Sequence, residues 1–262
     1  MCVGLPTTED RKMMNEETRR KLREMSLEEM VNALDIQAGD PQYTNLSFDD
    51  RMKMLVDYTY QAKYTSKVKR LMKMARFRIP SADLHDVYYV DRHLDREMIL
   101  GLSSCQFISN SENVVFQGFT GSGKSYLACA LGKEACKQGI RTRYIRLPDL
   151  LTEWEEAKLE AHGVTKLLKR YSGYRLLILD EWLIQIPTEE QLHFLFELIE
   201  RRYDEGSTIF CTQYKKEDWH ERLSGGILAD SILDRVIHRT SWVYSGDLNM
   251  RELLAKREQQ KV

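Results

Sequence analysis

The chain has 262 residues and a formal net charge of −1, with 42% hydrophobic and 30% charged residues. This composition can bury a sizeable core and excludes fibrous and membrane-spanning classes, since no apolar run approaches the roughly 18 residues that a membrane helix needs. The five cysteines are scattered without a Cys-x-x-Cys pair, so neither a disulfide framework nor a zinc site is expected. Residues 1–10 lack a signal-peptide pattern, and we expect a cytoplasmic protein.

Helical patterns come first along the chain. Ser26 with Glu29, and Ser47 with Asp50, have the spacing of residues that cap the start of a helix, and apolar residues at helical spacing follow each pair. The second of these helices runs into a strongly basic stretch. Ile79-Pro80 is expected to end it, because proline pushes the residue before it out of helical geometry.

The basic stretch from Tyr60 to Arg78 contains seven basic residues and no acidic one. A solvated helix face is the alternative, but such faces usually mix both signs because like charges repel, so the patch favours a polyanion. No pattern for base recognition accompanies it, and we expect contacts to the DNA backbone that do not depend on sequence. The expected contact residues are Lys63, Lys67, Lys69, Arg70, Lys73, Arg76 and Arg78. A smaller second candidate consists of Lys166, Lys169 and Arg170.

Beyond residue 85 short apolar segments alternate with helical stretches. The expected strands are residues 114–116, 142–147, 176–179, 208–211 and 241–244. Strands separated by helices indicate a parallel sheet with helices on both faces. We therefore predict an α/β domain over residues 86–262, preceded by a small all-α domain over residues 1–85.

Residues 118–125 spell Gly-Phe-Thr-Gly-Ser-Gly-Lys-Ser, a full match to the phosphate-binding pattern G-x-x-x-x-G-K-[ST]. The glycines let backbone N–H groups turn toward a phosphate, and the following helix points its positive end at the anion. This predicts binding of ATP with Mg²⁺, in which Lys124 contacts the β- and γ-phosphates and Ser125 the metal. The expected nucleotide-binding residues are Gly118, Thr120, Gly121, Ser122, Gly123, Lys124, Ser125 and Tyr126.

Residues 176–181 spell Leu-Leu-Ile-Leu-Asp-Glu, an apolar strand that ends in two acids. Ligands of parallel sheets bind at the carboxyl ends of the strands. Asp180 is expected there as a magnesium ligand, and Glu181 as the general base that activates the attacking water. Acids are common at strand ends, so it is the combination with residues 118–125 that predicts ATP hydrolysis. Gln213, at the tip of the fourth expected strand, can reach the same water or the γ-phosphate.

The order of these motifs resembles the IstB-like AAA+ ATPases, helper proteins of bacterial insertion sequences that are related to the DnaC helicase loaders. Residues 217–221 (Glu-Asp-Trp-His-Glu) and 229–238 (Ala-Asp-Ser-Ile-Leu-Asp-Arg-Val-Ile-His) carry the more specific part of the resemblance. Residues 46–51, followed by the basic helix, resemble the helical domain of the family. The resemblance covers about residues 20–251.

The resemblance implies an AAA+ P-loop ATPase domain in a regulator of transposition. Such proteins form ATP-dependent homo-oligomers on double-stranded DNA, bend it and deliver it to a partner transposase. Position by position, it implies that Arg235 reaches the γ-phosphate in a neighbouring subunit and that Gln213 is the polar sensor. Residues 246–251 depart from the Gly-x-Ser-Tyr-Arg pattern of the family, so Arg251 has no assigned role.

Two other functions stay open at this point. A loader of replicative helicases shares these motifs, and would favour single-stranded DNA and a helicase partner. A nucleotide-gated DNA scaffold with incidental hydrolysis belongs to a different class. Glu181 argues against the scaffold, since a protein that only binds nucleotide needs no base beside Asp180.

Overall fold

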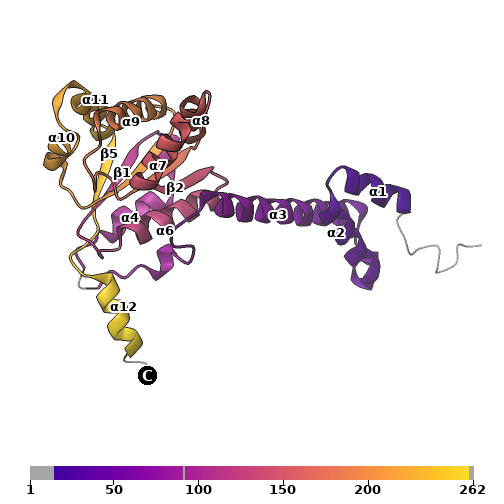
Figure 1. Ribbon diagram of the computed structural model, residues 1–262. Helices are drawn as coiled ribbons and strands as arrows, with labels where there is room; N and C mark the ends of the chain where they lie inside the picture. The colour runs from indigo at the N-terminus through magenta and orange to yellow at the C-terminus, as the bar shows by residue number, and fades with distance from the viewer. Residues whose placement is uncertain (1–14, 91, 260–262) are drawn as a thin grey trace, which may run out of the picture. The chain divides into compact units, whose positions relative to one another are not determined.

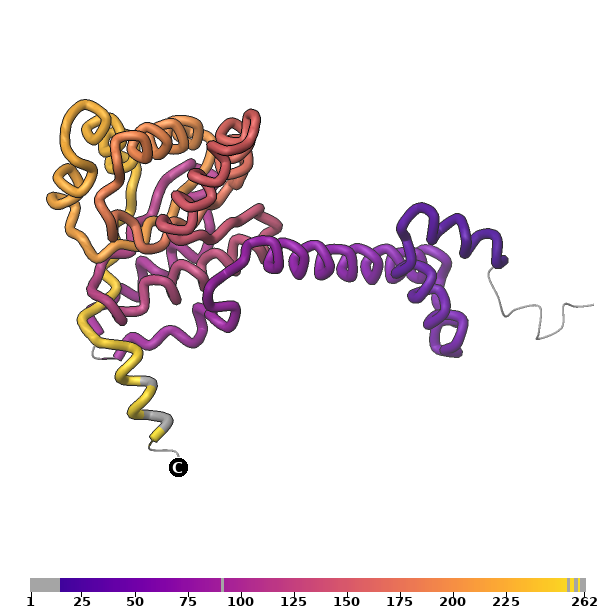
Figure 2. The backbone as a smooth tube through the Cα atoms, in the orientation of Figure 1, coloured from indigo at the N-terminus to yellow at the C-terminus, as the bar shows by residue number. Residues whose placement is uncertain are grey.

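The computed structural model describes residues 15–90 and 92–259, which divide into two compact units between Lys69 and Arg70. The first unit is helical, as predicted. In Figure 2 its longest helix, α3, is one continuous helix. The elements that begin in this unit are α1 (Glu16–Glu24), α2 (Glu28–Gly39), the 3-10 helix η1 (Pro41–Asn45) and α3 (Phe48–Ala75).

One of the two expected caps is present. The Asp50 amide donates a hydrogen bond to Ser47 Oγ at 3.1 Å, and the Ser47 hydroxyl donates to the Asp50 carboxylate at 2.6 Å, which confirms the cap of α3. The expected pair of Ser26 and Glu29 is wrong. Ser26 has a φ of 57° and α2 has Leu27 as its N-cap, without a side-chain hydrogen bond.

The basic helix ends earlier than expected. α3 stops at Ala75, ahead of Ile79-Pro80, and Arg76 follows in the left-handed region with a φ of 54°. The next residue, Phe77, is buried in the core of the second unit. The early end therefore has a tertiary cause, since the chain must leave the helix for Phe77 to reach that core.

The division between the units also falls before the boundary expected near residue 85. Leu71 and Ala75, on the last turns of α3, are buried in the same core as Phe77 and Ala82. These buried apolar residues make residues 70–85 part of the second unit. The last turns of α3 therefore belong to the second unit, although the helix begins in the first.

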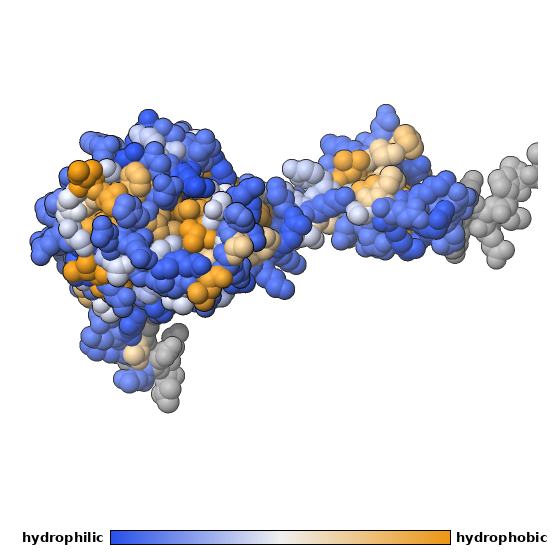
Figure 3. Space-filling view, turned by 45° about the horizontal axis from the view of Figure 1, so that its top comes forward, coloured by the Kyte–Doolittle hydropathy of each residue, from blue (hydrophilic) through white to orange (hydrophobic). Residues whose placement is uncertain are grey.

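The surface of the first unit is mostly hydrophilic, with hydrophobic residues in small patches (Figure 3). Some large apolar side chains of α3 are exposed, among them Phe48 and Tyr60. Within the described part of the chain, no helix is both long and apolar enough to cross a membrane.

The second unit is built on a five-stranded sheet with strand order β2-β3-β4-β1-β5, in which every neighbouring pair is parallel. This confirms the predicted α/β class, and each expected strand is present to within one residue at either end. The strands are β1 (Asn113–Gln117), β2 (Thr142–Arg146), β3 (Leu176–Asp180), β4 (Ser207–Thr212) and β5 (Thr240–Tyr244).

Helices cover both faces of the sheet (Figure 1). One face is covered by η2 (Leu84–Asp86), α4 (Arg96–Ser103), α5 (Gln106–Ser109) and α6 (Lys124–Lys137). The other face is covered by α7 (Leu147–Lys158), α8 (Gly163–Ser172), α9 (Glu189–Arg202), α10 (Trp219–Arg222) and α11 (Gly226–Ile237). The 3-10 helix η3 (Lys216–Asp218) precedes α10, and α12 (Met250–Gln259) follows the last strand.

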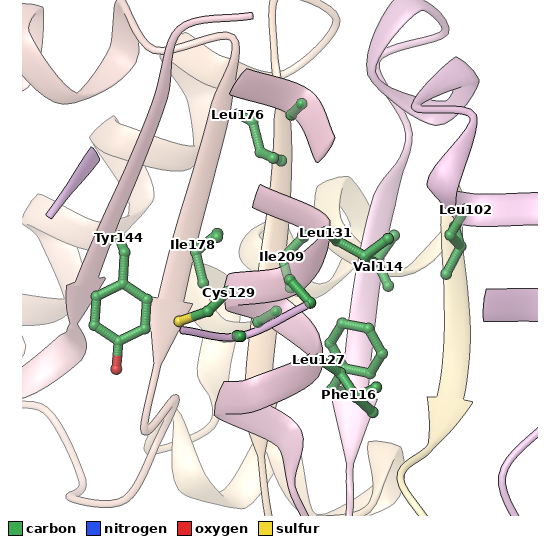
Figure 4. Close-up of a cluster of buried hydrophobic side chains, with 14 of the residues drawn as sticks. Leu102, Val114, Phe116, Leu127, Cys129, Leu131, Tyr144, Leu176, Ile178 and Ile209 are labelled. Carbon is green, nitrogen blue, oxygen red and sulfur yellow. The ribbon is translucent and has the colours of Figure 1, made fainter. Parts of the chain in front are cut away.

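Side chains of successive strand residues enter the two cores alternately. Ile178 packs with the α6 layer, whereas Leu177 and Leu179 pack on the opposite face. Figure 4 shows Ile178 among the α6 core residues, together with Tyr144, whose ring comes from the neighbouring strand β2. All five residues of β3 are buried, as expected for a central parallel strand. Its last residue, Asp180, therefore lies buried at the carboxyl end of an inner strand.

Candidate nucleotide-binding site

A cavity of about 560 Å³ opens at the carboxyl ends of β1, β3 and β4. The strand order makes these three strands neighbours, so the loop after β1, the two acids after β3 and Gln213 after β4 line one space. Of the expected nucleotide-binding residues, Gly118 and Ser122 belong to the loop but do not line the cavity. The others do, and they are Thr120, Gly121, Gly123, Lys124, Ser125 and Tyr126.

The loop between β1 and α6 has a backbone that depends on glycine. Gly121 and Gly123 have φ values of 93° and 92°, in the left-handed region that other residues avoid. A Cβ atom on Gly121 would also lie 2.5 Å from Oδ1 of Asn249. Glycine is thus required at both positions by the backbone conformation, and at Gly121 also by the close approach of Asn249.

Lys124 is folded back onto this loop. Its Nζ donates hydrogen bonds to the carbonyl oxygens of Gly118 at 2.7 Å and Phe119 at 2.8 Å. Burial lowers the pKa of Lys124. Its direct partners are carbonyl oxygens, and among the described residues no carboxylate forms an ion pair with it. A half-buried ammonium without a paired acid fits an anionic ligand such as a phosphate.

Asp180 is 2% exposed and is held by three donors. Its Oδ2 accepts hydrogen bonds from the Ser125 hydroxyl and the Tyr144 hydroxyl, both at 2.6 Å, and its Oδ1 accepts one from the Glu181 amide at 2.8 Å. Burial and the charge of Asp180 raise the pKa of Tyr144, which keeps its hydroxyl protonated as a donor. Ser125 and Asp180 are oxygen donors in contact at the cavity, and this pair fits Mg²⁺, which usually takes few protein ligands.

Glu181 follows Asp180 with a φ of 56°. Its Oε1 accepts a hydrogen bond from Arg78 Nη1 at 3.1 Å, and its Oε2 lies 3.1 Å from Arg146 Nε. Arg146 Nε makes no hydrogen bond of good geometry, so its contact with Glu181 is an ion pair only. The expected base therefore faces a guanidinium at each oxygen.

Three of these contacts were missed by the sequence analysis. Arg146 and Tyr144 come from β2, and Arg146 is its last residue, so the rule that strand ends share one edge could have indicated it. Arg78 was expected on the DNA surface, and the structure places it in this cavity. No spacing or periodicity links Arg78 to Glu181, which is 103 residues away.

The C-terminal segment closes one side of the loop. Arg92, which is 7% exposed, donates to the Ser245 carbonyl through Nε at 2.7 Å and to the Ser122 carbonyl through Nη2 at 2.5 Å. The Met250 amide donates to the Gly121 carbonyl at 2.9 Å. Arg251 also lines the cavity. The sequence contains no pattern that predicts the position of Arg92.

Gln213, the expected polar sensor, and Arg235, the arginine expected to reach a neighbouring subunit, lie in different places. Gln213 lines the cavity and accepts a hydrogen bond from the Thr120 hydroxyl at 3.3 Å. Arg235 lies on α11, away from the cavity, where it pairs with Glu200 and lies over the Phe196 ring at 5.2 Å. In its own chain Arg235 therefore contacts no part of the nucleotide site.

Six residues of the basic stretch, five on the second half of α3 and Arg76 just after it, present an exposed surface. In the described part of the chain none of the six forms an ion pair with a carboxylate. These six are Lys63, Lys67, Lys69, Arg70, Lys73 and Arg76. In the second candidate patch, Lys166 and Lys169 are exposed, whereas Arg170 pairs with Glu153.

Comparison with known proteins supports the nucleotide site. Residues 20–259 match the family model described as IstB-like ATP binding protein. An insertion sequence ATP-binding protein of Sinorhizobium fredii is 31% identical over 92% of this chain and 97% of its own length. The ATP-binding protein of insertion sequence IS1162 from Pseudomonas fluorescens is 35% identical over 77% of this chain and 87% of its own length.

Solved structures agree on the fold. The crystal structure of the DnaC helicase loader superposes with a TM-score of 0.52 at 21% identity, over 62% of this chain and 96% of that one. At this level of identity the likeness shows the fold alone.

The contact between Tyr144 and Asp180 yields a test of the magnesium site. Tyr144→Phe removes one donor to the carboxylate, and loss of such a partner typically weakens metal binding about tenfold or more. We expect a fluorescent ATP analogue to need about tenfold more Mg²⁺ for half-maximal binding. Tyr171→Phe is the matched control, because this buried tyrosine donates to Glu153 at 2.8 Å outside the cavity. Equal magnesium midpoints for the two variants would contradict the assignment.

Proposed function

Because the chain belongs to the IstB-like ATP-binding protein family, we propose that it hydrolyses ATP and acts in transposition. In this proposal it assembles on double-stranded DNA, bends it and recruits a partner transposase. The observation that carries the hydrolysis is the pair of Asp180 and Glu181 at the cavity that also holds the phosphate-binding loop. Relatives named after insertion sequences match nearly the whole chain, which favours transposition over helicase loading.

The chemistry follows from the positions of the side chains. Lys124 supplies a cation that the loop leaves without a paired acid, and it would neutralise the β- and γ-phosphates. Magnesium, held by Ser125 and Asp180, would further neutralise the phosphate oxygens when bound. Glu181 would accept a proton from a water molecule whose oxygen attacks the γ-phosphorus. The bond from that phosphorus to the bridging oxygen then breaks and leaves ADP and phosphate.

DNA binding is proposed for the six exposed basic residues on the second half of α3 and just after it. Their apolar neighbours Leu71 and Ala75 are buried, so the same helix packs on one side and presents positive charge on the other. Six exposed positive charges with no acid among them suit a phosphate backbone. Arg78, the seventh basic residue, is already occupied by Glu181.

Hydrolysis between subunits is proposed from the position of Arg235. Its guanidinium lies outside the cavity of its own chain, beside Glu200 and Phe196. An arginine from an adjacent subunit can stabilise charge on the γ-phosphate only when two protomers dock. Turnover should therefore depend on assembly.

Replacement of the base tests the enzymatic proposal. Glu181→Gln should retain ATP binding and lower steady-state turnover by about two orders of magnitude or more, because the amide cannot accept the proton. Lys124→Ala should abolish binding itself. The matched control is Glu197→Gln, an exposed acid on α9 that pairs with Arg201. Near-normal turnover in Glu181→Gln would instead favour a scaffold with incidental hydrolysis.

Salt titration tests the DNA surface. Alanine at Lys69, Lys73 and Arg76 should weaken binding to all duplex sequences alike, and should flatten the log–log salt dependence by roughly 0.9 per lost phosphate contact. A control removes three basic residues that pair with acids on or next to α1, namely Arg20, Lys21 and Arg23. Unchanged affinity and slope in the α3 variant would assign the DNA surface elsewhere.

Mixed variants test hydrolysis between subunits. Arg235→Ala should bind ATP and turn over poorly, and Lys124→Ala protein should partly restore activity by supplying its intact arginine. Specific activity should also rise with protein concentration and with added DNA. Arg239→Ala, which removes an exposed arginine paired with Asp204, should behave as wild type. Rates that follow the mixing ratio additively, without rescue, would place Arg235 outside the reaction.

A further inference from the structure

Arg78 contacts both acids of the nucleotide site. Its Nη1 lies 3.1 Å from Glu181 Oε1 and 3.9 Å from Asp180 Oδ2. Burial lowers the pKa of Arg78, but its hydrogen bonds to Tyr144 and Glu181 and the charge of Asp180 outweigh this, and its pKa lies above the usual value. The guanidinium is therefore part of the carboxylate cluster, although its side chain is partly exposed.

The backbone holds Arg78 in this place. The preceding Phe77 is buried against α6, where a Cβ atom on Gly132 would lie 2.5 Å from its ring. The following Ile79 also packs against this core. Arg78 thus projects from a short segment that is fixed on both sides, so its contact with Glu181 is set by the fold.

A carboxylate acts as a base only through an oxygen that can reach water. Glu181 has a hydrogen-bonded guanidinium at Oε1 and an ion pair at Oε2. We propose that Arg78 is a positioning residue that restrains Glu181, so that the Oε1 atom of the base becomes free when this contact opens. The inference rests on the proposed hydrolysis and adds a residue outside the nucleotide motifs to that reaction.

The restraint should be weak and reversible. The side chains of Arg78 and Glu181 are 42% and 25% exposed, and ion pairs at such sites are partly screened by water. Loss of the contact is therefore expected to raise turnover about two- to fivefold, which is the range of a partly exposed ion pair.

The test compares Arg78→Gln with Arg201→Gln, an arginine on α9 with the same 42% exposure and a surface ion pair to Glu197. Arg78→Gln should raise kcat two- to fivefold at unchanged KM, and Arg201→Gln should match wild type. Arg78→Lys, which retains the charge, should fall between wild type and Arg78→Gln. In a Glu181→Gln background the Arg78→Gln change should have no effect, because the proposed restraint acts on the base.

A binding measurement separates this role from phosphate binding. At saturating Mg²⁺, a fluorescent ATP analogue should bind Arg78→Gln as tightly as wild type. Weaker binding together with lower kcat would make Arg78 a phosphate ligand and overturn the proposal, as would an unchanged kcat. If wild-type protein shows no turnover that Lys124→Ala removes, the proposed hydrolysis itself fails. Turnover that is present in wild type but equal in Arg78→Gln defeats only the present inference.

Discussion

The buried carboxylate of Asp180 constrains the whole nucleotide site. An acid that is 2% exposed must have its oxygens satisfied by neighbours, or the charged form would be too costly to bury. Its donors come from three elements: Ser125 from α6, Tyr144 from β2 and the Glu181 amide that follows β3. The hydrogen bond from Ser125 fixes the end of the phosphate-binding loop beside the last residue of β3. The relative positions of the loop and the two acids follow from these contacts.

What the sequence predicts well depends on local signals. The phosphate-binding loop, the apolar strand before Asp180 and the five strand positions each follow from spacing or from apolar runs within a few residues. The cap at Ser47 is confirmed for the same reason. The equally regular pair of Ser26 and Glu29 fails, because Ser26 adopts a left-handed turn just before α2. A spacing rule alone cannot distinguish these two cases.

What the sequence does not predict depends on contacts between distant segments. The end of α3 is decided by the burial of Phe77 against α6, which outweighs the signal at Ile79-Pro80. The pairing of Arg78 with Glu181 joins residues 103 positions apart, and a basic run offers no sign that its last member turns toward an acid. Arg92 has no motif at all, yet it joins the phosphate-binding loop to the segment after β5.

The hydrogen bond from the Met250 amide to the Gly121 carbonyl has a mechanical consequence. Met250 is the first residue of α12, a helix of ten residues, which at 1.5 Å per residue is about 15 Å long. This hydrogen bond therefore ties the start of α12 to the phosphate-binding loop, so the two cannot move independently while the bond is kept.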